Sequence, residues 1–143
     1  MNVTDEKDVG HPEYDPDVSR PLFVLASCPV ESRPEGAPRL WGNLKIKIST
    51  ESMAYRIYGR EEISEAFTCN FELNAEYREI LEDSGARICG VDQNDRASLI
   101  EFPDRDFYII AGFQPQLNST EDNPHPLITA FLNAAEAYRE GKA

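Results

Sequence analysis

The chain has 143 residues, a length typical of one domain, and 41% of them are hydrophobic, which permits a core and excludes a disordered chain. Its formal net charge is −12, so nucleic-acid backbones and anionic membranes would be repelled by its surface. The polar, acidic N-terminal segment is unlike a secretory signal, and no apolar run approaches the ~20 residues that cross a bilayer. These features predict a soluble, cytoplasmic protein that binds neither nucleic acid nor membrane.

The residues that most often bind metals are few and far apart. Cys28, Cys69 and Cys89 form an odd, widely spaced set, which argues against a disulfide framework and fits a reducing compartment. His11 and His125 lie at opposite ends of the chain, and no cysteine pair has the spacing of a zinc knuckle. The sequence therefore predicts no metal site and implies no cofactor.

Residues 1–20 are predicted to be an irregular lead-in to a single domain over residues 21–143. Strands are predicted where short apolar runs or apolar–polar alternation occur, at residues 21–27, 40–49, 67–73, 86–92, 98–102 and 106–113. Helices are predicted where capping residues flank a helical apolar spacing, at residues 50–59, 74–85 and 123–143. Strands interleaved with helices indicate an α/β fold with a mixed sheet.

Two of the strands are expected to be the central and most buried ones. Residues 21–27 and 107–113 are continuous apolar runs, which burial on both faces of a sheet requires. The last helix is expected to pack on this sheet through one apolar stripe, formed by Leu127, Ile128, Phe131, Ala135 and Tyr138.

Four stretches resemble the C-terminal glutaminase domain of CTP synthase, a class I glutamine amidotransferase. Residues 62–90 are similar to that family's Arg-Tyr-Glu-Val-Asn segment and the helix after it. Residues 106–135 resemble its strand, Phe-His-Pro-Glu-Phe, loop and His-Pro-Leu helix. Residues 10–26 and 40–48 are weaker matches in the same order. The segment around Cys69 looks closer to an uncharacterised group related to the C-terminal region of CTP synthase. The resemblance implies part of the three-layer amidotransferase fold.

The resemblance also implies where the family's chemistry would lie. That family uses a cysteine nucleophile, a histidine base and a glutamate that orients the histidine. The base and the orienting residue match Gln114 and Gln116, and a neutral amide can neither take a proton near neutral pH nor stabilise an imidazolium. The family's glutamine-binding arginine matches Asn70, whereas its glutamine-contacting glutamate is retained as Glu13. We therefore expect a catalytic corner without its acid–base chemistry.

The nucleophile has no counterpart at all. The family carries it on a Gly-x-Cys-x-Gly elbow, and no such pattern occurs in this chain. The resemblance covers only the later half of the family's domain, so the chain is expected to be a short gene product, to start at a misassigned residue, or to be completed by another chain.

Several readings stay open at the individual residues. Gln114 and Gln116 could bind a ligand or simply finish a strand. Cys69 could be a relocated nucleophile acting with Glu13, and Cys28 a weaker candidate, although a lone cysteine near a strand is more often a small buried residue. His125 is expected to cap the last helix rather than to act in catalysis.

Two classes of function follow from these residues. The first is a degenerate amidotransferase-like module that binds a partner or a small molecule without hydrolysing glutamine. The second is an enzyme, either a glutaminase of CTP synthase completed by a missing N-terminal half or a new thiol enzyme. A half-domain would leave a sheet edge uncovered, so a homo-oligomer or a complex with the chain that supplies the other half is expected.

Overall fold

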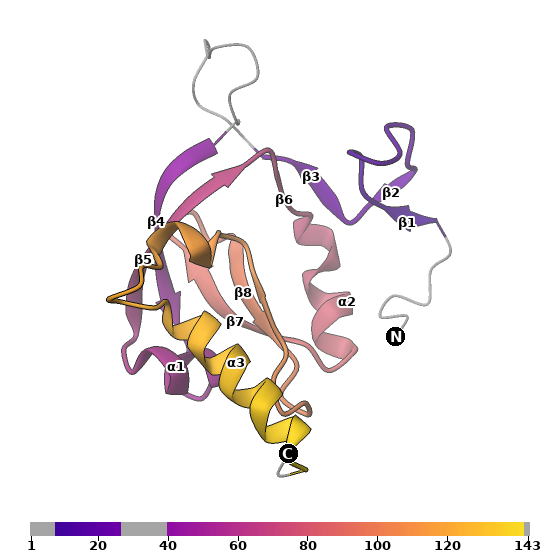
Figure 1. Cartoon of the computed structure of the whole chain (residues 1–143). Coiled ribbons are helices and arrows are strands. Elements are labelled where there is room, and N and C mark those ends of the chain that lie inside the picture. Colours follow the sequence, from indigo (N-terminus) through magenta and orange to yellow (C-terminus); the bar gives the residue numbers. More distant parts are fainter. Residues whose placement is uncertain (1–7, 27–39, 142–143) are drawn as a thin grey trace.

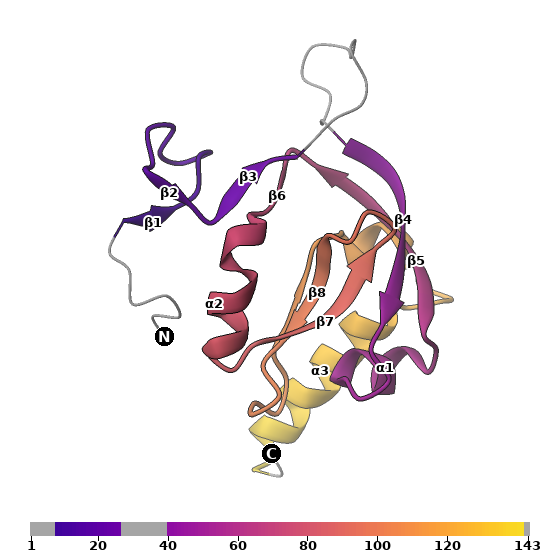
Figure 2. The same cartoon turned by 180° about the vertical axis from the view of Figure 1, so that it is seen from behind.

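The structure, a computed structural model, describes residues 8–26 and 40–141. Its centre is a five-stranded sheet with the order β5-β4-β7-β8-β9, in which every neighbouring pair is antiparallel. The helices α1 (Met53–Tyr58) and α3 (Pro126–Arg139) lie on one side of this sheet, and α2 (Arg78–Asp83) lies on the other (Figures 1 and 2). The expected α/β class with a sheet between helices is confirmed.

The strands of the main sheet are β4 (Leu40–Ile48), β5 (Glu62–Cys69), β7 (Arg87–Asp92), β8 (Ala97–Glu101) and β9 (Ile109–Ala111). Two short pairs lie beside it (Figure 1), namely β1 (Val9–Gly10) with β2 (Arg20–Pro21), which is parallel, and β3 (Phe23–Leu25) with β6 (Phe71–Leu73), which is antiparallel. Two 3-10 turns, η1 (Ala75–Tyr77) and η2 (Pro115–Asn118), complete the elements.

The strand predicted at residues 40–49 is confirmed as β4. Leu44, Ile46 and Ile48 are buried, whereas the lysines between them are exposed, as the period of two in a strand with one wet face requires. The two strands predicted at residues 86–92 and 98–102 are also confirmed, and they pair as the antiparallel hairpin β7–β8. Its turn is fixed because Asp92 Oδ1 accepts hydrogen bonds from the backbone N–H groups of Asn94 and Arg96, at 2.8 and 3.0 Å.

The two predicted helices in the middle of the chain are confirmed with shifted caps. Ser52, rather than Thr50, caps α1 by accepting from the Tyr55 N–H, and Gly59 ends it in the left-handed conformation. Asn74 caps the first turn of the second helix as expected, but this turn is the 3-10 helix η1, and α2 continues from it.

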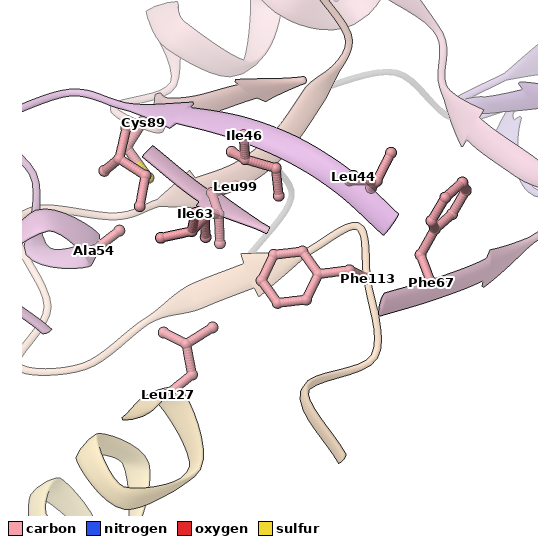
Figure 3. Close-up of a cluster of buried hydrophobic side chains, with 10 residues drawn as sticks. Leu44, Ile46, Ala54, Ile63, Phe67, Cys89, Leu99, Phe113 and Leu127 are labelled. Carbon is pink, nitrogen blue, oxygen red and sulfur yellow. The ribbon is translucent and has the colours of Figure 1, made fainter. Parts of the chain in front are cut away.

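The main core fills the side of the sheet that α1 and α3 cover. Leu99 and Ala54 are 0% exposed and lie among aliphatic and aromatic side chains from four strands (Figure 3). A second, smaller cluster, in which Leu81 of α2 packs against Ile100 and Phe102, lies on the opposite side. Burial of apolar area on both faces holds the layers together, at roughly 25 cal/mol per Å².

The two strands expected to be central are not. The first becomes β3, which pairs only with β6 outside the main sheet, and its Leu25 is 57% exposed. The second becomes β9, the last strand of the main sheet, with Ile110 44% exposed. A continuous apolar run predicts a strand that is buried on both faces of the sheet. At β9 the run belongs instead to an edge strand, and no described strand pairs with its outer edge.

The expected stripe on the last helix is correct only in its first turn. Leu127 is buried in the main core, while Phe131 and Tyr138 are 55% and 78% exposed. The first turn of the helix contributes Leu127 to the main core, and the helix then runs to the C-terminus at the bottom of Figure 1. Most of this stripe is therefore left on the surface.

Over the ranges that the structure describes, no helix is long and apolar enough to cross a membrane.

The packing of Leu99 generates a prediction on stability. Replacing Leu99 with alanine removes buried methyl groups from the main core, and we expect it to lower the free energy of unfolding by about 2–5 kcal/mol in urea titrations. Leu117→Ala is the matched control, because Leu117 is 53% exposed, and it should change the stability by less than about 0.5 kcal/mol. Similar losses in both variants would contradict this account of the core.

Candidate functional site

A cleft of about 490 Å³ lies between the sheet and the segments around β3, β6 and α2. Its walls include apolar rings from both sides, such as Phe23, Phe71 and Tyr108, and its size suits a small organic molecule. Four of the residues singled out by the family resemblance line it together: Glu13, Cys69, Asn70 and Gln114. Segments that are far apart in sequence thus meet at one place.

Gln116 does not line this cleft. It lies exposed on η2, and its backbone carbonyl accepts from the Ser119 N–H at 3.4 Å. Cys28 lies outside the described residues.

Gln114 is held by the backbone of the neighbouring strand β5. Its side-chain Oε1 accepts from the Thr68 N–H at 2.8 Å, and its Nε2 donates to the Thr68 carbonyl at 3.0 Å. Its own backbone N–H reaches the Ala66 carbonyl at 3.3 Å. The amide therefore pairs with Thr68 as a neighbouring strand would, and only a group with both a donor and an acceptor can do so. This favours the reading of Gln114 as a residue that completes the strand edge.

Cys69 ends β5 and is half-buried, and its thiol donates to the Phe71 carbonyl. A carbonyl oxygen cannot take the proton that a nucleophilic thiol must lose. Asn70 and Glu13 are both exposed at the cleft, and the Glu13 N–H donates to His11 Nδ1 at 3.1 Å.

The cleft has a single guanidinium group in its described wall, and that group is already paired. Arg96 donates to Asp92 at 2.7 Å and to Glu72 at 2.9 Å, and all three residues line the cleft. Burial lowers the pKa of Arg96, but the hydrogen bonds and charges of Asp92 and Glu72 outweigh it and raise that pKa overall. A ligand carboxylate would find no uncommitted cation among these side chains.

A buried polar network behind the cleft was missed from the sequence. Glu65 and His125 are 4% and 3% exposed, and His125 Nε2 lies 3.0 Å from Glu65 Oε1. Tyr58 Oη donates to the same oxygen at 2.8 Å, and Asn118 Nδ2 donates to the other at 2.9 Å. Burial raises the pKa of Tyr58, and the hydrogen bond and charge of Glu65 add to the rise.

The expected capping role of His125 is confirmed, and it sets the tautomer. His125 Nδ1 accepts from the Leu127 N–H at 3.2 Å, at the N-cap of α3. Because Nδ1 accepts, the ring proton lies on Nε2 and is donated to Glu65. The signal for this network was present in β5, where Glu65 stands between Ile63 and Phe67 at the inward positions of an alternating strand. A carboxylate at an inward position requires buried partners.

A second buried carboxylate caps α1. Glu101 is 1% exposed, and its Oε2 accepts from the Met53 N–H at 2.7 Å, where the helix dipole favours negative charge. Its Oε1 accepts from Arg87 at 3.3 Å. Burial raises the pKa of the nearby Cys89 thiol to about 12, and the charge of Glu101 contributes. Cys89 is thus kept neutral and is a core residue.

No protein-family model matches the chain. It is 32% identical over 131 residues to the CTP synthase of Staphylococcus carnosus, covering 91% of this chain and 24% of that protein. It is 28% identical over 142 residues to the CTP synthase of Cytophaga hutchinsonii, covering 99% and 26%. The chain therefore spans about a quarter of the length of the CTP synthases that it matches.

Two solved structures have a similar fold. The Trypanosoma brucei CTPS glutaminase domain with bound acivicin matches with a TM-score of 0.81 at 23% identity, over 94% of this chain and 53% of that one. A putative GMP synthase protein of Thermoplasma acidophilum matches with a TM-score of 0.55 at 18% identity, over 82% and 50%.

The network around Glu65 generates a prediction on stability. Glu65→Ala leaves the buried His125 and the half-buried Tyr58 without their shared acceptor, and it also removes the hydrogen bond to the exposed Asn118. We therefore expect a loss of about 3 kcal/mol in the free energy of unfolding. Glu62→Ala, an exposed carboxylate on the same strand, should change it by less than about 0.5 kcal/mol. Equal effects in urea titrations would show that the network contributes little.

The raised pKa of Cys89 generates a prediction on pH. Its pKa is about 12 in the folded chain against an ordinary 9.0, so the unfolded chain loses this proton first and stability falls as the pH rises above about 9. We expect Cys89→Ala to weaken the fall in unfolding free energy between about pH 8 and about pH 10, measured by urea titration. An unchanged slope would mean that another group dominates there.

Proposed function

Because the chain is related to the CTP synthases and has the fold of a CTP synthase glutaminase domain, we propose that it is an amidotransferase-like binding module that does not hydrolyse glutamine. One observation carries the proposal. The side chain at the position that resembles the family's base, Gln114, is an amide whose donor and acceptor are both used by Thr68. It neither takes up a proton nor faces a thiol that needs a base.

The surroundings of the cleft support the same reading. The Cys69 thiol donates to a backbone carbonyl, and Arg96 is committed to Asp92 and Glu72. Glutamine carries a carboxylate, and an amidotransferase must hold it with a cation or with several donors. The cleft is suited instead to a small molecule that needs no such cation, held through the apolar rings in its walls.

We also propose that the module works in an assembly, as a homo-oligomer or with a chain that supplies the other half of the domain. The support is the apolar edge of the sheet at β9, with Tyr108 and Ile110 48% and 44% exposed. Surfaces of this kind are usually paired or covered. The proposed setting is pyrimidine biosynthesis in the cytoplasm, since the relatives are CTP synthases and the acidic chain has few cysteines.

Glutamine turnover by the purified chain tests the first proposal. We expect no release of ammonia above background, because losing even one member of a coupled triad costs several orders of magnitude in rate. The double variant Gln114→His, Gln116→Glu should stay equally inactive, since the one described thiol at the cleft, Cys69, is hydrogen-bonded to the Phe71 carbonyl. An added authentic glutaminase serves as the positive control in the same buffer.

Two outcomes would contradict the proposal. Ammonia release that disappears in Cys69→Ala would make the chain a thiol enzyme. Release that survives the replacement of Cys28, Cys69 and Cys89 together would require a mechanism without a thiol.

A further inference from the structure

The outer edge of β9 carries peptide groups that no described strand pairs with. The backbone N–H of Gly112 and the carbonyl of Tyr108 bond to β8, through Ser98 and Phe102, and Ile110 is paired with Ile100. Peptide groups alternate in direction along a strand, so those of Ile109 and Ala111 face away from β8. Within the described ranges, β9 ends the sheet order and no strand lies beyond it.

This edge lacks the features that usually protect an edge strand. Residues 107–113 contain no charged residue and no proline. Natural edge strands avoid pairing through charges, prolines, bulges or a covering segment. An uncharged, apolar edge of this kind is a template for pairing with another strand.

Apolar surface extends on both sides of the edge. On one side, Tyr108 and Ile110 reach the large cleft. On the other side, Phe107 and Phe131 of α3 line a groove of about 250 Å³, with their ring centroids 5.9 Å apart. Beyond this groove, Leu132 of α3 is 59% exposed. A partner strand added to β9 would cover both apolar surfaces at once.

We propose that β9 pairs antiparallel with β9 of a second copy of this chain, about a two-fold axis that passes through Ile110 perpendicular to the sheet. The inference rests on the assembly part of the proposed function and gives it a place and a partner. In this register Ile109 of each copy lies opposite Ala111 of the other. Both have outward-facing peptide groups, so each such pair exchanges both of its hydrogen bonds.

The charges beside the strand favour this register. Asp104 and Asp106 precede β9 in each copy. Antiparallel pairing about Ile110 places these two acidic turns at opposite ends of the joined strands, so the carboxylates of the two copies do not meet. Gln114 and Gln116 do not continue the strand, because Gln114 pairs with Thr68 of β5 and Gln116 lies on η2.

The axis also brings the two α3 helices to the same face of the joined sheet. A two-fold axis perpendicular to a sheet keeps each helix on its original side. The exposed Phe131 and Leu132 of one copy then lie towards those of the other. The net charge of −12 on each copy opposes association, so added salt should tighten the dimer by screening that repulsion.

Sedimentation velocity over a range of micromolar concentrations tests the interface. We expect a dimer, and we expect Ile110→Lys to raise its dissociation constant at least about tenfold, because two uncompensated charges would meet at the axis. Ala111→Pro should act likewise, since it removes an N–H that faces the partner and spares the ladder to β8. The matched control is Ser64→Lys, which adds the same charge to the exposed face of β5 at the opposite edge, and should leave the dimer intact.

Cross-linking provides a second measurement that does not depend on affinity. Residues at position 110 of the two copies would form a non-hydrogen-bonded antiparallel pair, within the Cα distance that a disulfide accepts. Mild oxidation of Ile110→Cys should therefore yield a covalent dimer, whereas the wild-type chain under the same oxidant should not.

Three results would overturn the proposal. These are a monomer at all concentrations and salt levels together with no cross-linking of Ile110→Cys, a dimer unaffected by both edge variants, and binding of β9 only to a different chain. Folding of each variant is checked by its urea transition. None of these results bears on glutamine turnover, so the proposed dimer and the proposed absence of glutamine hydrolysis are tested separately.

Discussion

The carboxylate of Glu65 is the point at which four segments of this chain are joined. It projects inward from β5 and accepts hydrogen bonds from Tyr58 in α1, Asn118 in η2 and His125 at the start of α3. A buried charge of this kind is tolerated only when its acceptor sites are used. The place of α3 on the sheet, and the course of the segment from Gln114 to His125, both depend on satisfying this one group.

The geometry of the segment that follows β9 depends on these hydrogen bonds to Glu65. With η2 tied to Glu65 and α3 capped by His125, Gln114 is brought beside Thr68 and its amide continues the hydrogen bonding of β5. A position that resembles a catalytic base is thereby part of the framework. At the cleft, the Gln114 amide, the Cys69 thiol and the Arg96 guanidinium each have hydrogen-bond partners within the chain.

Apolar side chains remain exposed along β9 and the later turns of α3. In the interior, by contrast, the buried carboxylates have hydrogen-bond partners. The negative charge of this chain opposes association, whereas an exposed apolar area favours it. Binding at the cleft and assembly at β9 concern adjoining surfaces, since Ile110 borders both.

Much of the local structure, and the relationship to the CTP synthases, could be predicted from the sequence alone. Alternation defined β4, turn residues defined the β7–β8 hairpin, and caps defined α1 and the second helix, because these signals act between neighbouring residues. The family resemblance singled out Glu13, Cys69, Asn70, Gln114 and Gln116, and the structure brings all of these except Gln116 to one cleft. Three features could not be predicted from the sequence and appear only in the folded chain. Residues 107–113 form a sheet edge, the last helix leaves most of its stripe exposed, and the buried Glu65 accepts hydrogen bonds from three other segments. Each of these depends on which distant segment covers a surface, and composition along one segment carries no record of its neighbours in space.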